Sequence, residues 1–441
     1  MPVRIGSRLR AAFASGDFES LRALYAPEAL LDWTLPGERL QARGPDEIVC
    51  ALASRWRGGE LLRWDESRFT SGVTVEFEGR MGGRLARQRQ FVQVRGGRVV
   101  RHQAYCARPH GAEPDELPDD GALAAARRLG TIARREPLTH AGQSGNSLER
   151  IVLADGRNLV AKRLSPDDWI ARNTHDEGRE VELWEQGVLA RMPAVVDHAV
   201  LDAGRDRDAG WLLMRDVSRE LLPPDRRLTR AESRRLLAAA AALHRVFAGE
   251  RIVGLCTLAD RISLTAPRLL AREGDAPDYL PKILVVGWEV FFDTVPADVG
   301  DAVADMLDDP EPAAAALARF ARTLVHGDLR GANVGLARER IVALDWGLAS
   351  EAPPELDFAW YLFVNGWRID ATRENLIEDF CELEGDLHDR RALAASWIAQ
   401  LCWHGGLLAH ELVESSDEKR ERARAELDWW VQRARESLEV L

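Results

Sequence analysis

Apolar and polar residues alternate in different ways along the chain, and the first pattern predicts a mixed α+β unit over residues 1–108. Helical spacing dominates "VRIGSRLRAAFASGDFESLRALYA" and "PDEIVCALASRW". Short β-rich runs follow, and Gly96-Gly97 in "FVQVRGGRVVRHQAY" is typical of a hairpin turn. Short helices followed by a strongly curved sheet predict an α+β cone.

From residue 122 the pattern predicts a β-rich small lobe over residues 122–217 and a helical large lobe over residues 218–441. In the small lobe, the strand-like runs "RIVLAD", "NLVAKRL" and "AGWLLMRDV" accompany one predicted helix, "HDEGREVELWEQGVLARM". The large lobe begins with the helical run "RAESRRLLAAAAALHRVF". A short island interrupts it, in which "TLVHGDL" is expected to end a helix and "RIVALDWG" to form a strand. The acidic, proline-rich residues 109–121 are typical of a linker.

Composition and charge narrow the class of protein. The 441 residues are 46% hydrophobic and 29% charged, an ordinary globular balance, and the net charge is −12. Such an acidic chain is not expected to bind nucleic acid, because phosphate backbones attract basic surfaces. No apolar run reaches the length of a membrane span, and the five scattered cysteines suggest neither a disulfide framework nor a zinc site. We therefore expect a reduced, cytoplasmic protein that does not associate with membranes.

One short segment, "HGDLRGANVGLARERIVALDWG" at residues 326–347, carries the residue types that phosphoryl transfer requires. That reaction needs a carboxylate to orient the attacking hydroxyl and oxygen ligands for Mg²⁺ on the nucleotide. The spacing of Asp328, Asn333 and Asp345 follows the kinase-like pattern of a loop aspartate, an asparagine five residues later and a strand-end aspartate. Asp328 is the predicted base, and Asn333 and Asp345 are the predicted metal ligands.

These motifs carry a family resemblance. Residues 125–441 resemble the aminoglycoside phosphotransferase and choline kinase superfamily, which shares the protein-kinase fold, because "HGDLRGANV" and "LDWG" match its catalytic and metal motifs. The resemblance implies transfer of phosphate from ATP, with Mg²⁺, to a hydroxyl of a small molecule. It also implies that His326 supports catalysis by holding the loop, and that Asp357 in "ELDFAW" braces this loop.

The same resemblance implies a nucleotide site in the small lobe. The chain has only three lysines among 59 basic residues, and one of them, Lys162, lies where the family places a lysine on the phosphates. Glu180 is the favoured partner of this lysine, in competition with three neighbouring glutamates. The further expected nucleotide contacts are Ser144, Gly145 and Asn146 in the phosphate loop "AGQSGNSLER", and Met214 and Asp216 in the hinge "LLMRDV".

Residues 1–108 look like the SnoaL-like members of the nuclear transport factor 2-like superfamily. The segments that carry this resemblance are "FASGDFESLRALYAPEALLDW" and "RQRQFVQVRGGRVVRHQAYC". Such cones bind small molecules, catalyse simple reactions or dimerise. Asp32 and His102 are the ionisable residues considered for a cavity, although a surface or hydrogen-bonded core position is favoured for each. We favour a homodimer through this unit over a role in gathering the acceptor.

Two other functions are compatible with parts of the pattern. A nucleotide-binding regulatory module without turnover is the main alternative, and the presence of Lys162, Asp328, Asn333 and Asp345 together disfavours it. A protein kinase is disfavoured because Gly347 and Asp357 are only ten positions apart, too close for a substrate-presenting activation segment. Tryptophans of the large lobe are expected mainly in the core, with one or two at the acceptor pocket. These are Trp288, Trp360, Trp367, Trp397 and Trp403.

Overall fold

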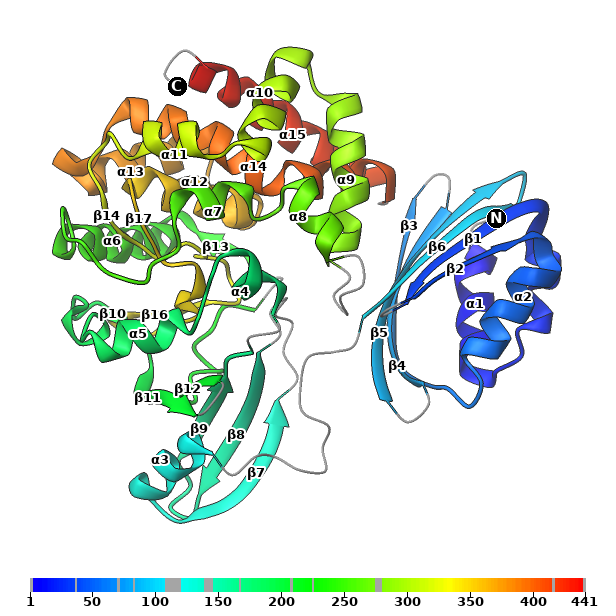
Figure 1. Ribbon diagram of the computed structural model, residues 1–441, viewed down its shortest axis with the longest axis horizontal. Coiled ribbons are helices and arrows are strands. Elements are labelled where there is room, and N and C mark those ends of the chain that lie inside the picture. Colours follow the sequence, from blue (N-terminus) through cyan, green and yellow to red (C-terminus); the bar gives the residue numbers. More distant parts are fainter. Residues whose placement is uncertain are drawn as a thin grey trace. The chain divides into compact units, whose positions relative to one another are not determined.

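The computed structural model describes residues 3–35, 38–69, 72–81, 84–107, 120–138, 146–165, 168–206, 209–223, 226–273, 280–414 and 417–438 (Figure 1). Contacts divide the chain into two compact units. The first contains residues 1–109, 267–300 and 404–429, and the second contains residues 110–266, 301–403 and 430–441. Among the helices in these described ranges, none is both long and apolar enough to cross a membrane. Most of the predicted linker, residues 109–119, lies outside the described residues.

The N-terminal part of the first unit is a six-stranded sheet with helices on one face (Figure 1). The strand order is β2-β1-β6-β5-β4-β3, with β1 and β6 parallel and the other pairs antiparallel. The helices and strands are α1 (Val3–Ser15), η1 (Glu19–Leu24), β1 (Tyr25–Leu35), β2 (Glu38–Arg43), α2 (Gly44–Arg55), β3 (Glu60–Phe69), β4 (Gly72–Met81), β5 (Arg84–Arg95) and β6 (Arg98–Ala107). This mixed α+β arrangement confirms the order of elements expected from the sequence.

An aromatic core holds this sheet to its helices. Phe13 of α1 contacts Phe18, Trp56 and Phe77 at ring separations of 4.9–5.0 Å, in edge-to-face and tilted geometries that aromatic pairs favour. The predicted hairpin between β5 and β6 is confirmed, because Gly96 and Gly97 have φ angles of 58° and 82°, which glycine adopts without strain.

His102 lies fully buried in this sheet, in a row of polar side chains. Its Nδ1 is 2.8 Å from the hydroxyl of Tyr25 and its Nε2 is 3.1 Å from Oε1 of Gln90. Burial lowers the pKa of His102 to about 4, so the ring is neutral at physiological pH. Asp32 is half-buried in β1. The hydrogen-bonded core position favoured for His102 is thus confirmed.

The second unit begins with a five-stranded antiparallel sheet in the order β11-β12-β9-β8-β7. Helix α3 covers it, and four apolar side chains of this helix join the core of the sheet. Its elements are α3 (Gly121–Leu129), β7 (Ile132–Leu138), β8 (Ser147–Leu153), β9 (Asn158–Arg163), α4 (Trp169–Asn173), α5 (Arg179–Glu185), η2 (Leu189–Arg191), β10 (Val196–Asp197), β11 (Val200–Asp206) and β12 (Ala209–Arg215).

Helix α5 is much shorter than the sequence predicted. The apolar spacing predicted one helix over residues 175–192, but the structure confines it to seven residues. Gly178, with φ 106°, precedes the helix, and Gly187, with φ 68°, follows it. Positive φ angles interrupt a right-handed helix, so these two glycines set the limits of α5.

After residue 227 the chain is mainly helical, as predicted. Helix α6 begins with a capping box, in which Thr229 and Glu232 satisfy each other's backbone N–H groups. The remaining elements are β13 (Leu228–Thr229), α6 (Arg230–Val246), α7 (Leu258–Ser263), α8 (Pro267–Arg272), α9 (Leu280–Thr294), α10 (Ala297–Asp308), α11 (Glu311–Leu317), β14 (Thr323–Val325), β15 (Val334–Leu336), β16 (Ile341–Ala343), η3 (Trp346–Leu348), β17 (Ser350–Ala352), α12 (Pro354–Asn365), η4 (Gly366–Arg368), β18 (Ile369–Asp370), α13 (Arg373–Glu384), η5 (Gly385–Leu387), α14 (Arg390–Glu414) and α15 (Asp417–Leu438).

The segment before the predicted catalytic loop was assigned wrongly. "TLVHGDL" was expected to end a helix, but its first three residues form β14, which pairs antiparallel with β17. The predicted strand in "RIVALDWG" is confirmed as β16, which lies between β10 and β15. The loop therefore starts and ends on buried strands, which position its side chains more firmly than a helix end would.

Candidate functional site

A buried carboxylate holds the start of the candidate catalytic loop. Asp357, in the first turn of α12, accepts the backbone N–H groups of His326 and Gly327, each at 2.7 Å. Gly327 has φ 87°, and a side chain there would meet the backbone of Leu348. Burial would raise the pKa of Asp357, but hydrogen bonding to His244 lowers it, so the carboxylate is charged. The predicted bracing role of Asp357 is confirmed.

His326 is fully buried and uses both ring nitrogens within the loop. Its Nδ1 lies 3.1 Å from the backbone N–H of Asp328 and accepts it, and its Nε2 lies 3.0 Å from the carbonyl oxygen of Leu344. This pattern requires the neutral tautomer with the proton on Nε2. Burial lowers the pKa of His326, which also favours the neutral ring. The ring packs on Trp346 at 4.3 Å, so its contacts are those of a support rather than of a base.

The two carboxylate oxygens of Asp328, the predicted base, have different donors. Oδ2 accepts Nδ2 of Asn333 at 2.8 Å and lies 3.2 Å from the guanidinium of Arg330. Oδ1 accepts the indole N–H of Trp360 at 2.9 Å. Burial raises the pKa of Asp328, and the charge of Arg330 opposes that rise.

Asn333 and Asp345, the predicted metal ligands, are linked through the backbone beside Asp328. The carbonyl of Asn333 accepts the N–H of Leu344 at 2.8 Å, which holds the end of β16 against the loop. The amide nitrogen of Asn333 donates a hydrogen bond to Asp328. The amide oxygen of Asn333 is therefore the atom that would face a cation. Asp345 has φ 67° and ψ 68°, a left-handed conformation uncommon outside glycine and concentrated at functional sites.

Lys162 on β9 lies between two carboxylates. Its Nζ is 2.5 Å from Oε2 of Glu180 on α5 and 2.7 Å from Oδ1 of Asp345. Burial would lower the pKa of Lys162, but the charges of Asp345 and Glu180 raise it. Burial would likewise raise the pKa of Asp345, but Lys162 lowers it to about 2. One ammonium thus serves two carboxylates, which leaves a surplus negative charge at this point.

The structure selects Glu180 among the glutamates that competed for Lys162. Its second oxygen, Oε1, accepts the backbone N–H of Trp346 at 3.1 Å, so Glu180 also holds the residue after Asp345. Glu182 and Glu185 instead face Arg205, at 3.6 and 4.0 Å.

The other predicted nucleotide contacts have partners of their own or lie outside the described residues. Asn146 is buried, and its Oδ1 accepts the backbone N–H of Ser165, which ties the segment before β8 to the end of β9. Met214 is buried in β12, and Asp216 accepts Nε of Arg150 at 3.0 Å. Ser144 and Gly145 lie outside the described residues.

Hydrogen bonds and ion pairs join six of the predicted residues into one site. These are His326, Asp328, Asn333, Asp345, Lys162 and Glu180.

The site contains residues that the sequence analysis did not assign to it. Trp360 was grouped with core tryptophans, yet it lies three positions after Asp357, on the same helical face, and this spacing was a usable signal. Arg330 lies inside the motif itself. His244 on α6 had no such signal, because its partners are over 100 residues away in the chain.

His244 supports Asp357 from within the helical region. Its Nδ1 donates to Oε1 of Glu384 at 2.7 Å and its Nε2 approaches Oδ2 of Asp357 at 3.4 Å. All three side chains are almost fully buried. Burial would lower the pKa of His244, but the two carboxylates raise it to about 10 from its ordinary 6.5. The imidazolium therefore links α6, α13 and α12 behind the loop.

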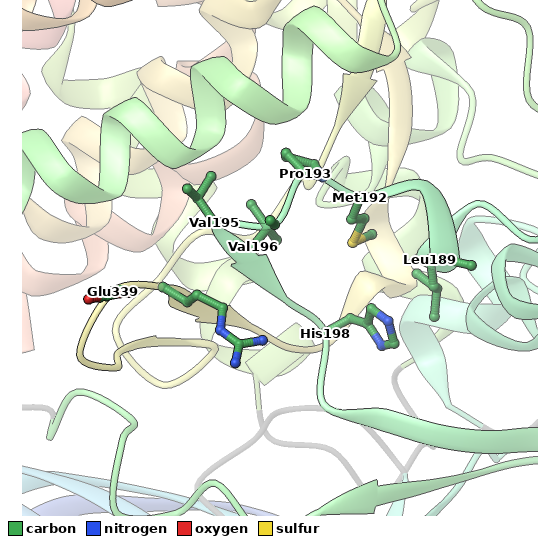
Figure 2. A pocket seen from close by; sticks show the side chains of 10 residues that line it. Leu189, Met192, Pro193, Val195, Val196, His198 and Glu339 are labelled. Carbon is green, nitrogen blue, oxygen red and sulfur yellow. The ribbon is translucent and has the colours of Figure 1, made fainter.

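A separate open hollow of about 480 Å³ lies in the second unit, between residues 189–198 and the turn at Glu339 and Arg340 (Figure 2). Met192, Val196 and His198 are among its lining residues. None of the predicted site residues within the described ranges lines it. We find no metal group of three or more His, Cys, Asp or Glu side chains in the part of the chain that the structure describes.

Comparisons with known proteins give one family match. Residues 139–395 match the model of the phosphotransferase enzyme family, which covers more than half of the chain. No curated protein matches the sequence. Among solved structures, choline kinase LicA from Streptococcus pneumoniae is 14% identical with a TM-score of 0.42, covering 69% of this chain and 97% of that one. An aminoglycoside phosphotransferase from Streptomyces rimosus, in complex with ADP and streptomycin, is 22% identical with a TM-score of 0.40, covering 64% and 97%.

The buried contacts of His244 with Asp357 and Glu384 predict a specific pH dependence of stability. Because the pKa of His244 is raised on folding, its contribution is fully present below about pH 6.5 and is lost as pH rises through about 10. His244→Gln should destabilise the chain by about 3 kcal/mol at pH 6, since it leaves buried carboxylates without their partner. The difference in thermal midpoint from the wild type should shrink steadily towards pH 10.

His102→Gln is the matched control for this experiment. His102 is equally buried but neutral, with a pKa near 4, so its loss should shift the thermal midpoint by the same amount at every pH between 7 and 10. A His244→Gln shift that stays constant over this range would show that His244 is not charged in the folded protein.

Proposed function

Because the chain belongs to the phosphotransferase enzyme family, we propose that it transfers the γ-phosphoryl group of ATP to a hydroxyl of a small molecule. The observation that carries this proposal is that the pair Asp328 and Asn333 is joined to the pair Asp345 and Lys162 through the backbone hydrogen bond from Leu344 to Asn333. Phosphoryl transfer depends on positioning and charge stabilisation rather than on covalent participation of the protein. These two pairs provide groups for both.

In this proposal Asp328 is the base. Its carboxylate is fixed by Asn333 and Trp360, and it would orient the acceptor hydroxyl and receive its proton as the new bond to phosphorus forms. The raised pKa of Asp328, caused mainly by burial, would make this carboxylate a better proton acceptor than an exposed aspartate. His326 would act only through the loop that it holds.

Lys162 would bind the α- and β-phosphates, and Glu180 would keep its ammonium in place. The phosphate loop with Ser144, Gly145 and Asn146, and the hinge around Met214 and Asp216, would complete the nucleotide site. Asp345 and the amide oxygen of Asn333 would hold Mg²⁺, for which carboxylate and amide oxygens are suitable ligands. When bound, Mg²⁺ neutralises negative charge on the transferring phosphate.

The acceptor is proposed to be a small molecule rather than a protein. The segment from Gly347 to Asp357 forms η3, β17 and the start of α12, and most of it is buried. It leaves no long loop on which a protein substrate would be presented. A screen of ATP consumption against aminoglycosides, choline, amino alcohols and other hydroxylated metabolites tests this proposal. A chain that binds nucleotide but consumes no ATP with any of these acceptors would support the regulatory alternative.

Replacing the proposed base should separate chemistry from binding. Asp328→Asn keeps the shape of the side chain but cannot accept the acceptor proton, so turnover should fall by about 10²–10⁴-fold. Mg²⁺-dependent ATP affinity, measured by calorimetry, should stay within about twofold of the wild type, since Lys162 and Asp345 are untouched. Unchanged turnover would exclude Asp328 as the base.

Replacing the proposed metal ligand should have the opposite result. Asp345→Asn removes the anionic ligand while Glu180 still holds Lys162, so the gain in ATP affinity on adding Mg²⁺ should drop by at least about tenfold. Affinity measured in the presence of a chelator should change much less. If added Mg²⁺ strengthens ATP binding equally in the variant and the wild type, Asp345 is not a metal ligand.

For the N-terminal α+β unit we propose a SnoaL-like domain that forms a homodimer. Its sheet ends on strand β3, where Leu62 is 46% exposed. Light scattering of the full chain should give the mass of a dimer, and Leu62→Arg should shift it towards the monomer. Val253→Arg is the control, because Val253 is 73% exposed in the second unit and its variant should remain dimeric. A monomeric wild type at micromolar concentration would contradict the proposal.

A further inference from the structure

Trp360 makes a contact with the proposed base that the family motifs do not describe. It lies in α12, and its indole N–H donates to Oδ1 of Asp328 at 2.9 Å. The other carboxylate oxygen of Asp328, Oδ2, accepts a hydrogen bond from Nδ2 of Asn333 at 2.8 Å. Donors to both oxygens restrict rotation of the carboxylate about its bond to Cβ. Trp360 therefore restricts a rotation of the carboxylate that the hydrogen bond from Asn333 alone would still allow.

The indole of Trp360 is itself held in place by a second tryptophan. Trp403 of α14 stacks on it with ring centroids 4.3 Å apart and an interplanar angle of 29°. The guanidinium of Arg261 lies over the ring of Trp403, 4.2 Å from its centroid, where a buried cation is attracted by the aromatic face. A ring packed in this way has little freedom to move its N–H away from Asp328.

Arg261 also connects this stack to the backbone of the loop. It is only 2% exposed and donates to the carbonyl oxygen of Gly327 at 2.8 Å and to that of Leu348 at 3.2 Å. Gly327 is the residue directly before Asp328. Arg261, Trp403 and Trp360 therefore fix both the backbone and the carboxylate of the base from one side.

We propose that Trp360 is a positioning residue that holds the carboxylate of Asp328 turned towards the acceptor hydroxyl. This inference rests on the proposed function of Asp328 as base. The indole N–H of Trp360 fixes Oδ1 of Asp328, and the amide N–H of Asn333 fixes Oδ2. Losing the indole N–H should release the carboxylate from this fixed orientation.

A purely structural tryptophan would not have these consequences. Phenylalanine can replace much of the stacking on Trp403 but has no N–H, so Trp360→Phe removes the donor while keeping an aromatic ring. A hydrogen bond to a charged group is typically worth about 10–100-fold in rate when it acts in the transition state. We expect the single-turnover rate of phosphoryl transfer to fall by that factor, with the KM for ATP unchanged.

The split between rate and binding is the decisive readout. In Trp360→Phe the single-turnover rate should fall while the affinity for Mg·ATP, measured by calorimetry, stays at the wild-type value, because the indole N–H contacts the base. Trp360→His retains a ring N–H, so it should recover part of the lost rate, and it also serves where the phenylalanine variant is poorly folded.

Trp430→Phe is the matched control. Trp430 is a buried tryptophan of the same helical region, packed against Phe363 and Trp397. Its variant should show a lowered thermal midpoint at most, with the single-turnover rate of the wild type. A wild-type rate in Trp360→Phe, or an equal loss of rate in Trp430→Phe, overturns the inference. If Asp328→Asn retains activity, it is the proposed function that fails, because another group is then the base.

Discussion

The buried carboxylate of Asp357 is the contact on which the geometry of the site depends. Backbone N–H groups at a sharp turn need acceptors when water is absent, and Asp357 supplies one oxygen to His326 and one to Gly327. Without it, the turn that exposes Asp328 would leave two buried donors unsatisfied. His244 and Glu384 behind it keep this charge in the interior, so three helices are tied to one loop.

The charges at the two ends of the site are arranged differently. The imidazolium of His244 lies between the carboxylates of Asp357 and Glu384, and all three side chains are almost fully buried. This arrangement stabilises the structure around the loop. Around Lys162 the ammonium is also shared by two carboxylates, but Asp345 is about one-third exposed and lies next to the catalytic loop. Like charges close together repel each other, and burial raises the pKa of Glu180 while Lys162 lowers that of Asp345. Under the proposed function, a cation bound at Asp345 would offset this repulsion.

The sequence predicted the parts of this site that lie within one motif or one strand. Asp328, Asn333 and Asp345 follow a spacing with a chemical reason, whereas Lys162 was predicted from the family resemblance, with the scarcity of lysine as support. The family expectation is confirmed for residues 139–395. Glu180 was only favoured, because a helix of uncertain length presents several glutamates. The shortening of α5 by two glycines explains that uncertainty.

The parts that could not be predicted depend on packing between distant segments. His244 contacts Asp357 and Glu384, which are 113 and 140 positions away in the chain. Trp403 stacks on Trp360 of another helix, and the spacing of apolar residues does not show which sides of the two helices face each other. The wrong helix at residues 323–325 has a similar cause. Apolar residues there fit either a helix or a short buried strand, and only pairing with β17, formed 25 residues later, favours the strand.

Asp345 shows how these distant contacts maintain a conformation that the local chain disfavours. The residue before it, Leu344, donates its N–H to Asn333 and accepts the ring N–H of His326. The residue after it, Trp346, donates its N–H to Glu180, and Asp345 itself pairs with Lys162. Both neighbours are therefore fixed by different segments, which leaves Asp345 little choice but the left-handed conformation observed. That conformation sends the carboxylate towards Lys162, while the hydrogen bond from Leu344 to Asn333 ties this part of the chain to the loop that carries Asn333 and Asp328.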